Sequence, residues 1–213
     1  MAKRICVPLL LLMTACGGCG FMRWLTYVFA PVSRTEAVNP TFPDLPGHSV
    51  AVVIFANQSI EFEYPYARLA LSRRIAAELE QRVNKVKVID PAVVLNYQDE
   101  NVNWDSMGKT ELGKVFKTDY VLLVSLMEYT AREPNSTNLY RGRIIAETGI
   151  YQTSLPEKQG RVWNVPSLGM VYPEDATAGL LSGEAGRILD ETEQRFVDKL
   201  VKNFYKYRKE MTQ

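Results

Sequence analysis

The stretch Ser49-Val50-Ala51-Val52-Val53-Ile54-Phe55-Ala56 is a continuous apolar run of strand length, without the polar positions that a helix surface requires. A run of this kind is typical of a central strand that is buried on both faces. We therefore take residues 49–56 as the strand around which the folded body is built.

The chain that follows this strand alternates between helical and extended patterns. A helix is expected over about residues 66–83, because Leu71, Ile75 and Leu79 recur on one stripe. Residues 86–89 then predict a second, shorter strand.

Two more helices are expected before the next central strand. Asp90 can cap a short helix over residues 91–97, and Asp105 or Ser106 can cap another. That helix leads to an apolar strand at residues 120–126. The alternation of strands and helices predicts at least partly parallel pairing, with the helices as crossovers.

The second half of the chain has a different pattern. Residues 141–153 and 161–165 predict a β-hairpin, and residues 167–172 a further strand. A long helix is expected over about residues 184–209. Its apolar face would carry Leu189, Phe196, Leu200, Phe204 and Tyr207. The predicted fold class is α/β (α+β), with a mixed sheet in two or three layers and the order β-α-β-α-α-β-β-β-α.

Composition limits the function classes. With 213 residues, 46% hydrophobic and 23% charged, the chain matches one ordinary globular domain plus export and tether segments. A formal net charge of +1 argues against binding to nucleic acid. His48 is the only histidine, and the only cysteines are Cys6, Cys16 and Cys19. We therefore expect no metal centre with His or Cys ligands, no other cofactor and no enzyme.

The first fifteen residues have the composition of an export signal. Residues 3–4 are basic, and Ile5–Ala15 is an apolar stretch within the roughly 7 to 15 residues of a signal peptide. The phrase Met13-Thr14-Ala15-Cys16 resembles the bacterial lipobox, in which the cysteine is lipidated and becomes the new amino terminus. This resemblance predicts a signal peptide over residues 1–15 and a lipid, such as palmitate, on Cys16.

Three alternatives stay open for this segment: an uncleaved anchor over residues 5–30, a plain secretory signal, and processing at Cys19. Arg23 weakens the anchor, because charge at bilayer depth is costly. Gly17 follows Cys16, where lipoproteins kept at the inner membrane carry an aspartate. The resemblance thus favours an outer-membrane lipoprotein that faces the periplasm.

Residues 21–29 combine aromatic side chains with one arginine, a composition that suits the headgroup interface of a bilayer. The membrane-interface candidates are Phe21, Trp24, Tyr27 and Phe29. The alternative is that they pack on the domain or on a neighbouring subunit. We expect residues 16–47 to form a lipid-anchored tether and a Pro-rich linker, and residues 48–213 a single α/β domain that ends in the long helix.

Three phrases of the body resemble a known group of envelope proteins. They are VAVVIFANQS at residues 50–59, VKVID at residues 86–90 and ELGKVFKTDYVL at residues 111–122. They are similar to phrases of the TolB amino-terminal-domain-like group, whose relatives include the lipoproteins CsgG, PelC and LpoB. The resemblance implies a non-enzymatic periplasmic scaffold, and several members of the group assemble into rings.

Together these patterns predict a non-enzymatic, lipid-anchored cell-envelope protein. It would act as a scaffold or adaptor in envelope assembly, secretion or export, and could form a homo-oligomer. Its expected partners are the membrane, through Cys16, and envelope proteins of unknown identity. The alternative is a periplasmic ligand- or glycan-binding accessory module of a transporter. Glu61 and Glu63, which flank Phe62, are interpreted as part of a solvated loop.

Overall fold

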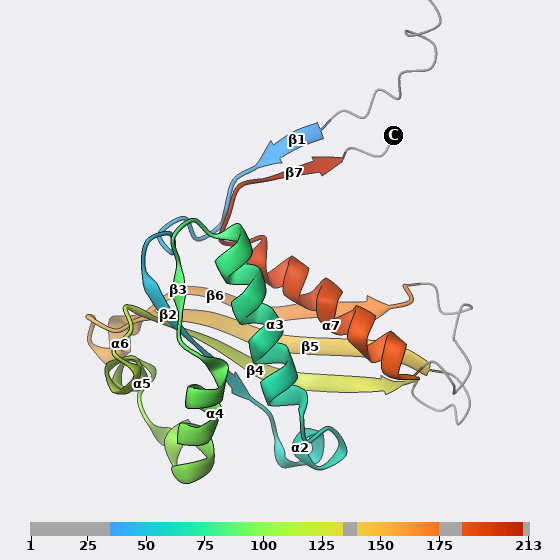
Figure 1. The fold of residues 1–213 in the computed structure, drawn as a ribbon, viewed down its shortest axis with the longest axis horizontal. Coiled ribbons are helices and arrows are strands. Elements are labelled where there is room, and N and C mark those ends of the chain that lie inside the picture. The colour runs from blue at the N-terminus through green and yellow to red at the C-terminus, as the bar shows by residue number, and fades with distance from the viewer. Residues whose placement is uncertain (1–34, 134–139, 175–184, 211–213) are drawn as a thin grey trace, which may run out of the picture. The chain divides into compact units, whose positions relative to one another are not determined.

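The computed structural model describes residues 35–133, 140–174 and 185–210 (Figure 1). These residues fall into two compact units. One contains most of a two-stranded sheet of β1 (Thr35–Val38) and β7 (Tyr207–Glu210), and the other runs from Val38 to Tyr207.

The larger unit is built on a five-stranded sheet with the order β3-β2-β4-β5-β6. Strand β2 (Ser49–Phe55) runs parallel to both of its neighbours, β3 (Lys87–Val88) and β4 (Tyr120–Arg132). Strands β5 (Tyr140–Gln152) and β6 (Arg161–Tyr172) continue the sheet in antiparallel pairing. The mixed α/β sheet is therefore confirmed, and β4 occupies its centre.

Helices α3 (Ala67–Arg82) and α7 (Ala185–Val201) lie side by side across one face of this sheet (Figure 1). Alternate side chains of the strands point toward them, as period-2 geometry requires. The core on this face includes Val50, Val52, Ile54, Leu71, Ile75, Leu79, Leu122, Val124, Phe196 and Leu200.

The opposite face is covered over β2 and the first part of β4. Its cover consists of α4 (Pro91–Glu100), the 3₁₀ helix η1 (Trp104–Ser106) and α5 (Lys109–Phe116). This smaller core is formed by Ala51, Val53, Val94, Trp104, Leu112 and Val121. The parallel half of the sheet thus has helices on both faces, which explains why β2 reads as an unbroken apolar run.

The segment after β2 differs from the solvated loop that was predicted around Glu61 and Glu63. Asn57 instead caps a short helix, α2 (Gln58–Glu63), because its side-chain oxygen accepts a hydrogen bond from the Ile60 amide at 3.0 Å. The expected cap at Asp90 is present, with its carboxylate accepting from the Ala92 amide at 2.9 Å. Helix α5 begins after Gly108, however, and not at Asp105 or Ser106.

The last helix is shorter than expected. It ends at Val201, and the amide nitrogen of the Asn203 side chain donates to the carbonyls of Lys199 and Leu200 at 3.2 and 2.9 Å. Tyr207 lies in β7, so the chain does not end in the long helix. In the sequence, Phe204 keeps the apolar spacing of the helix. The reason is that its side chain is also fully buried, although it lies in the turn after the helix.

Two further boundaries differ. The segment expected as linker up to residue 47 includes Phe42 and Leu45, which are buried in the core. The linker prediction is wrong for these positions, because burying two large apolar side chains fixes the segment to the body. Strand β6 is also one strand, where two were expected; the pairing with β5 is interrupted by a register shift between Ala146 and Thr148.

Candidate functional site

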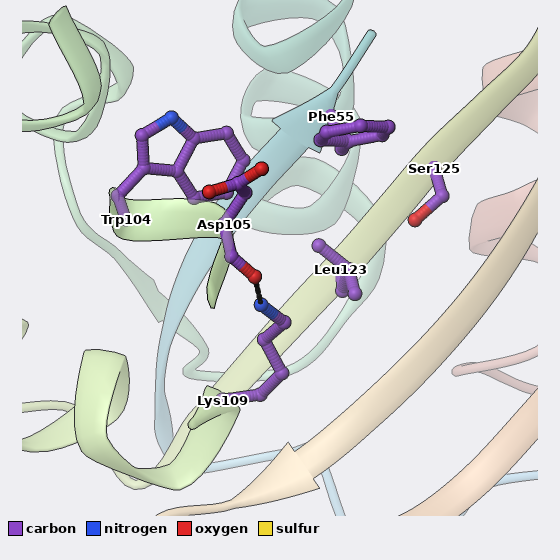
Figure 2. A pocket seen from close by; sticks show the side chains of 6 residues that line it. All are labelled: Phe55, Trp104, Asp105, Lys109, Leu123 and Ser125. Atoms are coloured by element: carbon purple, nitrogen blue, oxygen red, sulfur yellow. Dashed lines mark hydrogen bonds between the residues drawn. The ribbon is translucent and has the colours of Figure 1, made fainter. Parts of the chain in front are cut away.

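A pocket of about 250 Å³ opens where β2 ends and η1 begins (Figure 2). We call it the Trp104 pocket. Its lining residues are Phe55, Trp104, Asp105, Lys109, Leu123 and Ser125. Binding pockets for drug-sized ligands usually span roughly 300 to 1,000 Å³. This pocket is therefore suited to a single side chain or a molecule of similar size.

The apolar part of the pocket comes from three elements. Phe55 is the last residue of β2, and its ring meets that of Trp104 edge to face, with centroids 6.1 Å apart. Leu123 lies on β4, two positions before Ser125, so both side chains share this face of the sheet. Figure 2 shows these side chains around the opening.

Lys109 supplies a cation at the edge of the pocket. Its Nζ donates to the backbone carbonyls of Asp105 at 2.7 Å and Met107 at 3.0 Å, and lies 5.9 Å from the centroid of the Trp104 ring (Figure 2). Burial lowers the pKa of Lys109, against the opposing attraction of Asp105 and Glu157. An ammonium has three donors, so one more hydrogen bond can be made to an incoming group.

The position of Lys109 is set by the start of α5. The carboxylate of Glu157, in the short helix α6 (Glu157–Gly160), accepts from the backbone amides of Lys109 and Thr110 at 2.8 and 2.9 Å. Burial by itself raises the pKa of Glu157, but the hydrogen bonds from Thr110 and Lys109 outweigh it and lower that pKa. A remote carboxylate thus caps the helix that carries the lysine.

The arrangement can bind an apolar group, but its lining lacks the groups of a hydrolytic site. Ser125 is the only lining hydroxyl, and the lining contains no histidine that could take its proton. Asp105 is exposed and Lys109 is half-buried, so opposite charges flank an apolar floor. Such a site is typical of recognition, in which an apolar anchor is surrounded by a polar rim.

A second surface projects from α2, at the same end of β2. Phe62 is 91% exposed and Tyr66 is 78% exposed. Beside Phe62 lies a shallow hollow lined by Gln58, Ser59, Phe62, Glu63 and Arg132. We call these five residues and Tyr66 the Phe62 surface. A large aromatic side chain left in water on a short helix is a candidate anchor for a partner.

Helix α2 is tied to its neighbours by Arg68 of α3. The guanidinium pairs with Glu61 of α2 at 2.9 Å and with Asp99 of α4 at 2.8 Å. The Arg68 side chain is only 18% exposed, so its position is well defined. Through this arginine, the α2 segment that presents Phe62 is fixed to the body.

A polar cluster joins the starts of β2 and β4. Asp119 Oδ2 accepts from the backbone amide and the hydroxyl of Ser49, both at 2.8 Å, while the Ser49 hydroxyl accepts from the Asp119 amide at 2.9 Å. The bonds from Ser49 lower the pKa of Asp119. His48 Nδ1 lies 3.5 Å from the same carboxylate. Because Ser49 occupies the carboxylate, we interpret the cluster as a clasp between parallel strands.

The residues that the sequence singles out for membrane attachment lie outside the described part of the chain. They are Cys16, Phe21, Trp24, Tyr27 and Phe29. Their roles stay predictions. Within residues 35–133, 140–174 and 185–210, no helix is long and apolar enough to cross a membrane. The same residues contain no group of three His, Cys, Asp or Glu side chains that could hold a metal ion.

Sequence reasoning missed both surfaces. The Trp104 pocket draws its residues from β2, η1, α5 and β4, and no local motif links them. For the Phe62 surface, the sequence contains one indication of the helix that presents it. An asparagine directly after a strand, followed by three residues without glycine or proline, is compatible with a helix cap as well as a turn.

No protein-family model and no curated protein matches the sequence. Among solved structures, the lipoprotein GNA1162 from Neisseria meningitidis is similar with 16% identity and a TM-score of 0.43, over 70% of this chain and 98% of that one. The PelC dodecamer from Paraburkholderia phytofirmans is similar with 10% identity and a TM-score of 0.47, over 81% and 98%. At these values, function has to be inferred from the chain's own residues.

Proposed function

We propose that this chain is an exported, lipid-anchored, non-enzymatic protein of the cell envelope that works as a scaffold or adaptor. The observation that carries the proposal is the phrase Met13-Thr14-Ala15-Cys16 after a basic start and an apolar stretch. In this proposal Cys16 bears the lipid, the protein faces the periplasm from the outer membrane, and the α/β body recruits partners.

The folded body supports recruitment through two exposed features. The Trp104 pocket offers an apolar floor between opposite charges, and the Phe62 surface offers an exposed aromatic side chain. Hot spots of protein interfaces are built from such aromatic anchors and the pockets that receive them. Self-association is part of the proposal.

The tether is tested by Cys16→Ser in the full chain, with Cys19→Ser as the matched control. Cys16→Ser should cause precursor accumulation and loss from the membrane fraction, whereas Cys19→Ser should behave as wild type. Globomycin, which blocks lipoprotein processing, should reproduce the first result. Normal processing and an unchanged membrane fraction under both treatments would exclude a lipid on Cys16, and the reverse pattern of the two variants would move the lipid to Cys19.

A second candidate function is a periplasmic ligand- or glycan-binding module of a transporter. The observation that favours it is the Trp104 pocket, where an indole ring lies beside charged groups. This function is tested by titrating the protein with mono- and oligosaccharides and following its tryptophan fluorescence. Trp104→Phe is the control that separates the signal of Trp104 from those of Trp24 and Trp163. A saturable change that the control abolishes would favour this function over the scaffold.

A further inference from the structure

We propose that Phe62 of one copy inserts into the Trp104 pocket of a second copy, so that the chain associates with itself through this contact. The inference rests on the self-association part of the proposed function and is independent of the lipid on Cys16. In this contact the Trp104 pocket binds one side chain, and that side chain is the exposed ring of Phe62.

The apolar parts of the two surfaces are complementary. Phe62 is 91% exposed, so its ring does not occupy the pocket of its own chain. The pocket offers Phe55, Trp104 and Leu123, and its volume of about 250 Å³ suits one side chain better than a larger ligand. Aromatic rings pair well with the edges and faces of others, and Phe55 and Trp104 already pack in this way.

The charges at the two rims are complementary as well. The Phe62 surface carries Glu63 and Arg132, both exposed, beside the ring. The pocket carries Lys109 and Asp105. A copy that inserts Phe62 can therefore place Glu63 near Lys109 and Arg132 near Asp105. Opposite charges on both sides of an anchor fix its orientation and disfavour other partners.

The anchor is presented on a fixed element. Arg68 holds α2 through Glu61 and holds the end of α4 through Asp99, at 2.9 and 2.8 Å. The pocket is equally defined, since Glu157 caps the helix that begins at Lys109. Neither surface has to be reorganised for contact, which reduces the entropic cost of association.

The contact has two possible symmetries, and both lead to assembly. If two copies exchange Phe62 reciprocally, a two-fold dimer results; if each copy donates to the next, a ring or filament results. Multi-angle light scattering of the detergent-solubilised full chain distinguishes these assemblies by mass.

Cross-linking between two singly substituted chains tests the contact directly. One chain carries Arg132→Cys and the other Asp105→Cys, which leave Phe62 and the apolar floor of the pocket in place, and the native chain has no cysteine after Cys19. The mixed, oxidised chains should yield a disulfide-linked peptide pair between positions 132 and 105, identified by mass spectrometry. Val93→Cys, 54% exposed on α4, is the matched control in place of Arg132→Cys and should give no such pair. Absence of the 132–105 pair, or equal yield from the control, overturns the proposal.

A charge exchange gives an independent readout that does not alter the anchor. Asp105→Arg and Arg132→Asp should each weaken association about tenfold in a dilution series, and the double variant should recover most of it. A wild-type chain that is monomeric at every concentration overturns the proposal, as does full association of Phe62→Ala. Loss of liposome binding by Phe62→Ala with association unchanged would assign the ring to a membrane surface instead.

The same series in the Cys16→Ser background separates the two proposals. Association that persists without the lipid supports the Phe62 contact even if the tether proposal fails. If association disappears with the lipid and the 132–105 pair is also absent, the Phe62 contact is overturned and the tether proposal stays in place.

Discussion

Tyr129 on β4 donates a hydrogen bond from its hydroxyl to the buried carboxylate of Glu193 on α7. The other carboxylate oxygen is paired with Arg74 Nε of α3 at 2.8 Å. Burial raises the pKa of Glu193 and of Tyr129. One carboxylate therefore connects the central strand with both helices of the main core.

Replacing Tyr129 with Phe should destabilise the fold by about 1 to 3 kcal/mol, because Glu193 would lose one of its two partners while it stays buried. The ring contact with Tyr64, 5.0 Å between centroids, is kept in this variant. Urea denaturation measures the change. Tyr66→Phe is the control, since Tyr66 is 78% exposed and should change stability by less than about 0.5 kcal/mol. Equal stability of both variants would show that the Tyr129–Glu193 bond contributes nothing.

Gly142 allows β5 to approach α7 closely. A Cβ at this position would overlap with the Thr192 hydroxyl and lie 3.2 Å from the carbonyl oxygen of Ile188. Thr192 is fully buried and donates to that carbonyl at 2.6 Å, so it has little freedom to move. Gly142→Ala should therefore cost about 1 to 3 kcal/mol in thermal or urea unfolding.

Two variants check that the cause is this overlap. Gly169→Ala on the neighbouring strand β6 should be nearly neutral, because its new Cβ would meet only Ile145 at 3.8 Å. Adding Thr192→Ala to Gly142→Ala should recover part of the lost stability. If the double variant is as unstable as the sum of the single changes, the hydroxyl is not responsible.

The sequence predicts the elements well where a single local signal determines them. The apolar run of β2 and the stripe of Leu71, Ile75 and Leu79 each specify burial without any help from distant residues. The Asp90 cap is a second such case. Helix ends are less predictable, because Phe204 keeps the apolar spacing of α7 although it packs from the turn beyond it.

The candidate site could not be predicted in the same way. Phe55 and Leu123 look like ordinary strand residues, and only the parallel register of β2 and β4 brings them together. Lys109 acquires its place from Glu157, which lies 48 residues later in the chain. The exposure of Phe62 could not be predicted either, because phenylalanine is among the residues most often buried in folded proteins.

The clasp between Ser49 and Asp119 should make stability depend on pH at the acid end. The folded state lowers the pKa of Asp119 below its ordinary value of 3.8, because the ionised form accepts two bonds from Ser49. The stabilisation is therefore complete above that ordinary value and is lost as the pH falls through the lowered pKa.

Asp119→Asn should accordingly be less stable than wild type at pH 7, and the difference should shrink as the pH falls below about 3.8. Urea titrations at several pH values measure it. Ser49→Ala, which removes the hydroxyl donor, should reduce the same pH dependence in part. A difference that stays constant from pH 7 to pH 3 would exclude ionisation of Asp119 as its cause.

The cap that Glu157 provides from a distant part of the sequence should stabilise α5 as much as a cap from an adjacent residue would. Glu157→Ala leaves the amides of Lys109 and Thr110 without their shared acceptor, so a loss of about 0.5 to 2 kcal/mol is expected. Lys158→Ala, at the neighbouring exposed position, should be nearly neutral. Thermal unfolding gives the comparison, and a similar effect of both variants would mean that α5 does not depend on the remote carboxylate.

Arg68→Met should weaken self-association while it leaves the fold nearly intact. Its two ion pairs with Glu61 and Asp99 have exposed acidic partners, so their loss should cost only about 0 to 1 kcal/mol of stability. Helix α2 would lose its fixed link to α4, however, and Phe62 would have to be ordered at the moment of contact.

We therefore expect faster amide exchange over Gln58–Glu63 and about tenfold weaker association in light scattering. Arg82→Met is the matched control, because Arg82 pairs with Glu78 within α3 at 2.9 Å and touches neither surface. The two variants could associate equally well although amide exchange in α2 is faster only in Arg68→Met. In that case the ordering of α2 does not limit association, and the affinity comes from the fit of Phe62 in the pocket.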